Sequence, residues 1–262
     1  MAPMPPSRET RAHVWFSVFA GAFTGVLAGQ SVAHEPIRVA YECTEADADA
    51  FGFTCTMEDP CPVFLELAAA ELAGNRLIAT GNLHTKTVTL YSIVLASDDD
   101  GVTWTEPHER MRSSALEQIQ FLNAQNGWIT GVSVDPLARN PFLLITGDGG
   151  HSWRQMPILE DTKYATVAQL YFETASRGEL VLDVAQPKTV RQELYETQTG
   201  GESWELEQVS SAPIQLKGLR PAAQSPVRVR TDSAAGTFVV ERANGRAWNR
   251  VASFAVHLAN CE

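Results

Sequence analysis

Short apolar stretches alternate with polar turns along most of the chain. Three segments, 64–81, 119–131 and 170–183, share one pattern: an apolar stretch, a polar turn that contains glycine, and a second apolar stretch. A weaker echo spans 214–231. Short apolar runs bounded by turn residues predict β-strands. The alanine and glutamate content of 64–73 favours helix, but its alignment with the other segments predicts a strand there as well.

A turn motif with the pattern Ser/Thr-x-Asp-x-Gly-x-Ser/Thr-Trp follows each of these segments. It is complete in two copies, has Thr199 in place of aspartate in the third, and keeps only Gly245 and Trp248 in the fourth. The four tryptophans are 49, 51 and 44 residues apart, and a period of this length is typical of propeller blades. The motif residues of the first three copies are Ser97, Asp99, Gly101, Thr103, Trp104, Thr146, Asp148, Gly150, Ser152, Trp153, Thr197, Gly201, Ser203 and Trp204.

The residue types in this motif predict a structural clasp. Glycine supplies a positive φ in a tight turn, and the aspartate and hydroxyl side chains bond to the turn backbone. The tryptophan then packs its large face against the neighbouring unit. The acidic run 98–100 lacks the further ligand-spaced acid of a calcium loop, and the six histidines are scattered. We expect no catalytic residue, metal site or cofactor.

The first 33 residues have the layout of a secretory signal. Arg8 and Arg11 precede an apolar run of 14 residues, 14–27, and Ser31-x-Ala33 fits a small-residue cleavage site. The run is shorter than the roughly 20 residues that a membrane-spanning helix needs. We therefore expect export to the periplasm or the extracellular space, with no stable membrane insertion after cleavage.

Export predicts that the four cysteines pair. Cys55 and Cys61 lie close in sequence around a turn signal, and Cys43 and Cys261 lie near the two ends of the expected mature chain. Four cysteines allow three connectivities, and spacing alone does not choose among them. We predict that Cys43 pairs with Cys261, which ties the ends of a circular fold together.

The fold class that follows is all-β. We predict a small propeller of four, or at most five, four-stranded blades over 62–262, preceded by a strand and disulfide-bearing lead-in at 34–61. The 262 residues carry a formal net charge of −11, which disfavours a nucleic-acid partner.

The motifs resemble the BNR or Asp-box repeats of sialidase-like propellers. The pairing of GNRLIATG or NGWITG with a box such as TGDGGHSW is more similar to the photosystem II stability/assembly factor family. That resemblance implies an exported, non-enzymatic propeller that binds a protein partner as an assembly factor or scaffold, and this is the function we expect.

The alternative is a sialidase-like glycosidase or a carbohydrate-binding propeller. Sialidases gather three arginines on a substrate carboxylate and use a tyrosine and glutamate pair with an acid aspartate. The early Arg-Ile-Pro signature of that family is missing, since residues 35–38 read EPIR. Glu66 and Glu71 are placed to face a central channel, but the sequence pairs neither with a second acid. A box is specific for fold and says little about function.

The charge is uneven in a way that marks a candidate partner-binding face. Residues 217–250 contain seven basic residues against Asp232 and Glu241. Arg228 and Arg230 alternate along one strand, so they share a face; with Arg242 and Arg246 they are suited to an acidic segment of an envelope protein. The alternative, which we favour, is that these arginines pair with acids on adjoining blades.

Overall fold

The computed structural model describes residues 35–134, 137–186, 189–219 and 225–261. The chain divides into two units, Met1–Ala33 and His34–Glu262, and all that follows concerns the second. The predicted secretory signal lies outside the described residues. Among those residues, no helix has the length and apolar character that a membrane crossing requires.

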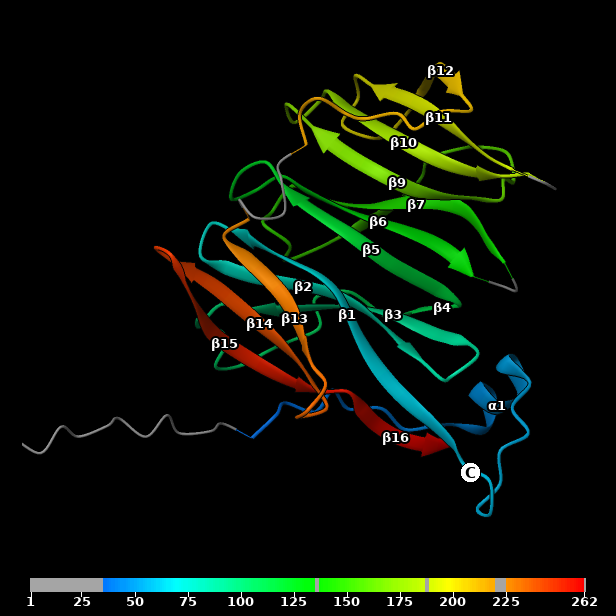
Figure 1. Cartoon of the computed structure of the whole chain (residues 1–262), viewed down its shortest axis with the longest axis vertical. Coiled ribbons are helices and arrows are strands. Elements are labelled where there is room, and N and C mark those ends of the chain that lie inside the picture. The colour runs from blue at the N-terminus through cyan, green and yellow to red at the C-terminus, as the bar shows by residue number, and fades with distance from the viewer. Residues whose placement is uncertain (1–34, 135–136, 187–188, 220–224, 262) are drawn as a thin grey trace, which may run out of the picture. The chain divides into compact units, whose positions relative to one another are not determined.

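Four antiparallel sheets build the fold (Figure 1). The first has the order β16-β1-β2-β3-β4 and contains β1 (Cys61–Ala73), β2 (Arg76–His84), β3 (Thr89–Ser97), β4 (Met111–Arg112) and β16 (His257–Cys261). The second contains β5 (Ser114–Phe121), β6 (Gly127–Val134), β7 (Ala138–Thr146) and β8 (Arg154–Pro157). The third contains β9 (Ala165–Phe172), β10 (Gly178–Ala185), β11 (Val190–Thr197) and β12 (Glu205–Ser210). The fourth contains β13 (Val227–Asp232), β14 (Thr237–Asn244) and β15 (Ala247–Ala255).

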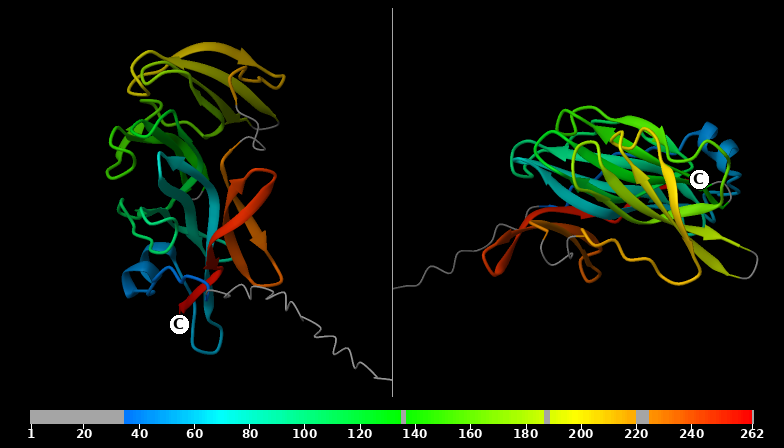
Figure 2. Two further views of the ribbon diagram at one scale, coloured as in Figure 1. Left: turned by 90° about the vertical axis from the view of Figure 1, so that its left-hand side faces the viewer. Right: turned by 90° about the horizontal axis from the view of Figure 1, so that it is seen from above.

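This arrangement confirms the prediction of a small all-β propeller in which each sheet is one blade. The segment 64–73 is a strand, as its alignment with the repeats predicted. The core lies between blades: eight of the nine residues of β2 are buried, because its sheet is covered on both faces by neighbouring sheets. The first blade contacts the fourth through β1 and β13, seen as neighbouring cyan and orange strands in Figure 2.

The strand count differs from four per blade at the two ends of the fold. The fourth blade has three strands, and Ile37 adds a parallel bridge to Phe254 at its outer edge. The first blade has five, because β16 pairs with the start of β1. Ile37 and strand β16 are therefore both fixed to the propeller, and the Cys43–Cys261 disulfide links the segments that carry them. The predicted pairing is confirmed, and Cys55 pairs with Cys61.

The lead-in at 34–61 contains a helix that the repeat pattern did not predict. Helix α1 spans Glu45–Phe51, and a reciprocal capping box between Thr44 and Asp47 starts it. Such a box satisfies two backbone N–H groups that a helix start leaves open. Asp47 is buried and also accepts hydrogen bonds from Tyr41 and Tyr91, so its carboxylate holds the helix against β3.

Candidate functional site

A central hollow of about 530 Å³ lies between the innermost strands of all four blades. Its walls come from β1, β5, β9 and β13 and from the connection that precedes β13. Apolar side chains such as Leu170 and Val227 form much of the lining, and Glu71, Glu117 and Tyr171 add polar groups. A concave, mainly apolar site with a few convergent polar groups is the usual form of a small-ligand site.

An irregularity in β5 places Glu117 in the lining of this hollow, where its side chain still keeps an exposed surface. The pairing of β5 with β6 shifts between Leu116 and Ile119, and the backbone N–H of Gln118 donates to Thr130 Oγ1 at 3.0 Å. Such a bulge re-aims the side chains beside it. The walls around the Glu117 carboxyl desolvate it and the negative charge of Glu66 adds to this effect, so the pKa of Glu117 lies above its ordinary value.

Glu71 lines the same hollow from β1, the inner strand of the neighbouring blade. The hollow is therefore lined by carboxyl groups from two different strands, and the pKa of one of them, Glu117, is raised. Two carboxyl groups around one cavity, one of which keeps its proton to a higher pH, are suited to general acid catalysis beside a stabilising charge. The sequence had offered Glu66 and Glu71 no second acid, and Glu117 supplies one.

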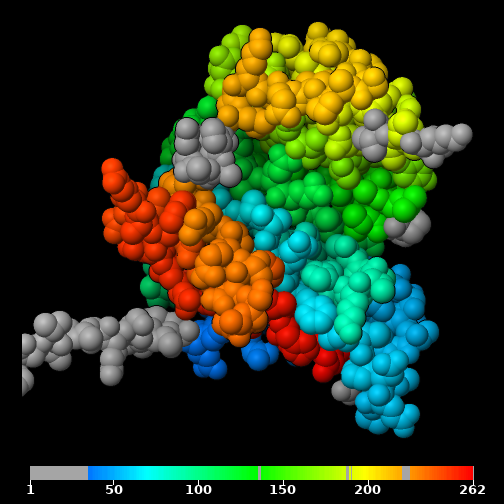
Figure 3. Space-filling model, viewed as in Figure 1, coloured from blue at the N-terminus to red at the C-terminus, as the bar shows by residue number. Residues whose placement is uncertain are grey.

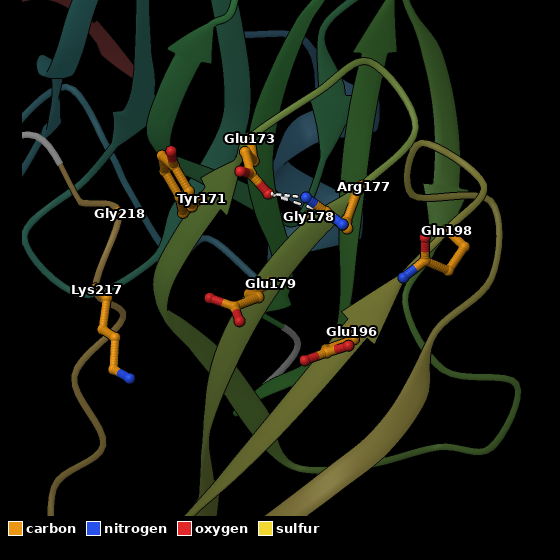
Figure 4. Close-up of a pocket in the computed structure, with 9 residues that line it drawn as sticks. All are labelled: Tyr171, Glu173, Arg177, Gly178, Glu179, Glu196, Gln198, Lys217 and Gly218. Atoms are coloured by element: carbon orange, nitrogen blue, oxygen red, sulfur yellow. Dashed lines mark hydrogen bonds and ion pairs between the residues drawn. The ribbon is translucent and has the colours of Figure 1, made fainter.

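A second, more polar cavity of about 490 Å³ adjoins the hollow (Figure 4). Tyr171 and Gly218 line both spaces. Gly218 lies so close to the Tyr171 ring that a Cβ atom there would overlap Cε1 and Cζ; only glycine lets the connection pass at this distance. Figure 3 shows this yellow to orange connection over the third blade.

The predicted motif residues form three turns of one geometry, boxes 97–104, 146–153 and 197–204. In the first, Asp99 accepts from Ser97 Oγ at 2.8 Å and from Thr103 Oγ1 at 2.6 Å. The hydroxyl bond from Thr103 and the backbone bond beside it lower the pKa of Asp99 to about 2. Asp148 accepts the same set of bonds; burial opposes its ionisation, but the bonds from Ser152 outweigh this and its pKa is well below normal.

The third box keeps this geometry, although the Thr199 side chain offers one oxygen atom where aspartate offers two. Thr199 Oγ1 accepts the backbone N–H of Ser203 at 2.9 Å and lies 3.0 Å from Ser203 Oγ. Thr197 Oγ1 accepts from the Gly201 N–H at 3.1 Å, as Thr146 does from Gly150 in the second box. Threonine thus replaces one carboxylate oxygen of the aspartate but lacks its charge.

Each box packs on the preceding blade. Trp153 of the second box lies edge to face with Phe121, 5.9 Å between ring centres, and joins a core that includes Ile78 of the first blade. Trp104 contacts Phe254 of the fourth blade at 5.1 Å. Trp204 contacts Phe172 at 6.0 Å, and Phe172 stacks on Trp128 of the second blade at 3.7 Å.

Three of the four arginines of the candidate partner-binding face form ion pairs with acidic neighbours. Arg228 pairs with Glu241 at 2.6 Å and its guanidinium lies 4.1 Å from the Trp248 ring centre. Arg230 approaches the same glutamate at 3.3 Å. Arg242 pairs with Asp100 of the first box at 2.6 Å. Arg246 is exposed.

Within the described ranges, no group of three or more His, Cys, Asp or Glu side chains is arranged to hold a metal ion. His84 approaches the carbonyl oxygen of Thr85 at 2.7 Å, and His151 lies 3.0 Å from Arg76 Nη1. Burial lowers the pKa of His108. These three histidines occupy separate surroundings.

The fold is similar to solved structures of two glycoside hydrolases. One is an alpha-L-arabinanase of Penicillium chrysogenum complexed with arabinobiose, with 13% identity and a TM-score of 0.39 over 75% of this chain and 62% of that chain. The other is Zg3597, a family 117 glycoside hydrolase of the marine bacterium Zobellia galactanivorans, with 9% identity and a TM-score of 0.38 over 84% of this chain and 75% of that chain. No family model and no curated protein matches the sequence.

These comparisons correct the expected function. Both structures are glycoside hydrolases, which contradicts the prediction of a non-enzymatic assembly factor or scaffold. The box motifs are local turns that hold neighbouring blades together. They therefore predicted the propeller architecture but not the catalytic or binding function of the protein.

Sequence reasoning missed the residues that gather across blades. Glu117 lies 46 residues after Glu71 in the chain, and no local motif links them. The signal available was the pair of consecutive polar residues Glu117-Gln118, which interrupts the alternation of apolar and polar positions in this strand and marks a bulge.

Proposed function

We propose that this protein is a glycoside hydrolase that binds a glycan in the central hollow. The observation that carries the proposal is the placement of Glu71 and Glu117 on neighbouring inner strands around one cavity, with the pKa of Glu117 raised by desolvation and by Glu66. Glycosidases use two carboxyl groups, one of them protonated at the working pH.

In the proposed reaction, Glu117 is the acid. Its raised pKa keeps a proton available for the glycosidic oxygen as the bond to the anomeric carbon breaks. Glu71 supplies the negative charge that stabilises the positive anomeric centre. A water molecule then adds its hydroxyl group to the anomeric carbon and gives its remaining proton to Glu117, which restores the acid. Glu66 acts through its charge on Glu117 and is not itself a catalytic residue.

The lining of the hollow suits a sugar ring. Tyr171 is half-buried and offers a ring on which the C–H face of a pyranose or furanose packs. Leu170, Val227 and the alanines of β1 complete an apolar wall. The name of one similar structure, an alpha-L-arabinanase complexed with arabinobiose, makes arabinan and its oligosaccharides the first substrates to test.

We also propose that the protein works outside the cytoplasm. Two disulfides involve all four cysteines, and structural disulfides persist in oxidising compartments. The apolar run and cleavage pattern of the first 33 residues supply a route of export.

The test is hydrolysis of a panel of linear polysaccharides, including arabinan, by the full chain expressed under oxidising conditions. Released oligosaccharides are separated by anion-exchange chromatography. We expect Glu117→Gln to lower kcat by about 10²–10⁴-fold, the usual contribution of a general acid. Glu207→Gln, on the exposed strand β12, is the matched control. Full activity of Glu117→Gln, or no hydrolysis of any member by the wild type, would contradict the proposal.

A further inference from the structure

The polar cavity beside the hollow is built on a row of three side chains across the third blade. Glu179 of β10 lies opposite Tyr171 of β9 and opposite Glu196 of β11 in the strand register. Residues paired in this way point to the same face of a sheet. All three are half-buried, and Figure 4 shows their side chains on one side of the strands.

The two glutamates of this row are opposed like charges without compensation. Neither carboxylate has a hydrogen bond or ion pair with any described residue. By contrast, Glu173 at the rim pairs with Arg177 at 2.5 Å. Like charges directly opposite each other destabilise a sheet, so folding alone does not account for the row, and such local conflicts are expected at functional sites.

Two other lining residues supply donors. Lys217 comes from the connection that crosses the blade, and Gln198 directly follows β11. The cavity thus presents acceptors on the strands, donors at Lys217 and Gln198, and the Tyr171 ring, which also lines the hollow. A hydroxyl group both donates and accepts, so a polyhydroxylated ring can bond to these acceptors and donors at once.

We propose that this cavity is a second sugar-binding site, which holds an uncharged sugar unit next to the one bound in the central hollow. The proposal rests on the proposed function and extends it from the place of cleavage to the class of substrate. Tyr171 lines both spaces, so one glycan chain that fills both passes along the side of its ring that Gly218 leaves uncovered. The Glu179 and Glu196 carboxylates repel a uronate at that position.

The experiment measures binding to Glu117→Gln protein, in which turnover is suppressed, by isothermal titration calorimetry. The probes are arabinobiose, arabinotriose, xylobiose, xylotriose, cellobiose, cellotriose and trigalacturonate. We expect a neutral trisaccharide to bind at least tenfold more tightly than its disaccharide, because only the longer chain reaches the cavity. We expect trigalacturonate to bind more weakly than that neutral trisaccharide.

Adding Glu179→Gln and Glu196→Gln should abolish the advantage of the trisaccharide and improve the binding of trigalacturonate. The matched control carries Glu205→Gln and Glu207→Gln on β12 of the same blade, where both side chains are exposed, and should bind as the parent does. Melting curves verify folding, and removal of opposed charges is not expected to destabilise the sheet.

The outcomes separate the two proposals. If neutral sugars bind and the wild type hydrolyses them, but the Glu179→Gln, Glu196→Gln protein keeps the trisaccharide advantage, the second site is refuted and the proposed function stands. If the wild type hydrolyses none of the glycans and no probe binds, both proposals fall.

Discussion

The side-chain amide of Gln120 on β5 makes two hydrogen bonds to the backbone of Phe172 on β9. Its Oε1 accepts the Phe172 N–H at 2.8 Å, and its Nε2 donates to the Phe172 carbonyl at 2.9 Å. Asn82 makes the same pair of bonds to Leu116. Gln169 makes an equivalent pair of bonds to two residues: it accepts from the N–H of Leu216 and donates to the carbonyl of Ile214. Amide side chains thus extend backbone hydrogen bonding from one blade to the next segment around the hollow.

We expect Gln120→Ala to destabilise the protein by about 2 kcal/mol, because it leaves an N–H and a carbonyl of a partly buried strand without partners. Urea unfolding followed by tryptophan fluorescence measures the change. Gln208→Ala, at an exposed position of β12, is the control and should change stability by less than about 0.5 kcal/mol. Equal free energies of unfolding for the two variants would show that water replaces the hydrogen bonds of the Gln120 amide at no cost in stability.

The repeats made the architecture predictable from the sequence. Each box combines turn glycine, a hydroxyl residue and tryptophan within eight residues, so local chemistry alone indicates the turn, and the period gives the blade. Cys43 and Cys261 lie on either side of the repeats in the sequence, and circular closure made their pairing a reasonable prediction. The α1 helix was not predicted, because its sequence signal, the Thr44–Asp47 capping box, is brief and lies outside the repeats.

The candidate site was not predictable in the same way. Glu117 and Glu71 line one hollow only because two inner strands converge there. The raised pKa of Glu117 arises from desolvation and from the charge of Glu66, 51 residues earlier in the chain. The row Tyr171, Glu179 and Glu196 requires strand register, which period and turn chemistry do not specify to the residue. The sequence pattern therefore does not predict which polar side chains from different strands lie next to one another.

Trp153→Ala should be severely destabilising. The side chain is 9% exposed, contacts Phe121, and packs beside Gly150, where a Cβ would overlap Ile78 of the preceding blade. Deleting a buried tryptophan costs about 3–5 kcal/mol, which lowers the melting temperature by roughly 10 °C for a domain of this size. Val102→Ala, 77% exposed in the first box, should leave the melting temperature unchanged. A melting curve that Trp153→Ala leaves unchanged would show that this tryptophan does not hold the box against the neighbouring blade.

Thr199→Asp should stabilise the third box and make that gain depend on pH. The pKa of Asp99 in the equivalent position falls from 3.8 to about 2 on folding. A depressed folded-state pKa contributes stability that is fully present above the unfolded pKa and is lost as pH falls through the folded value. We therefore expect a higher melting temperature than wild type at pH 7, and the difference should disappear between about pH 4 and pH 2.

Thr199→Asn is the matched control for this variant, since it supplies the same shape without the charge. Its stability relative to wild type should stay constant across that pH range. A gain in Thr199→Asp that survives at pH 2 would show that shape and not ionisation is responsible.

Loss of the Cys43–Cys261 disulfide should affect stability more than loss of Cys55–Cys61. The first closes a loop with a sequence separation of 218 and the second one of 6. Restriction of the unfolded chain predicts contributions of about 5 and about 2 kcal/mol. Guanidinium unfolding of the Cys43→Ser, Cys261→Ser protein and of the Cys55→Ser, Cys61→Ser protein compares them. A larger loss in the second double variant would contradict this order.

Glu66→Gln should shift the pH dependence of hydrolysis. The negative charge of Glu66 contributes to the raised pKa of Glu117, and the proposed acid must be protonated to act. Activity is therefore lost as pH rises through the pKa of Glu117. Removing the Glu66 charge lowers that pKa, so the alkaline limb of the kcat/KM profile moves to lower pH while activity at the acidic end of the plateau is retained. The control, Glu207→Gln, changes an exposed charge on the third blade and should leave the limb in place. A limb that is unmoved by Glu66→Gln would separate the titrating group from Glu117, because the charge of Glu66 contributes to the raised pKa of Glu117.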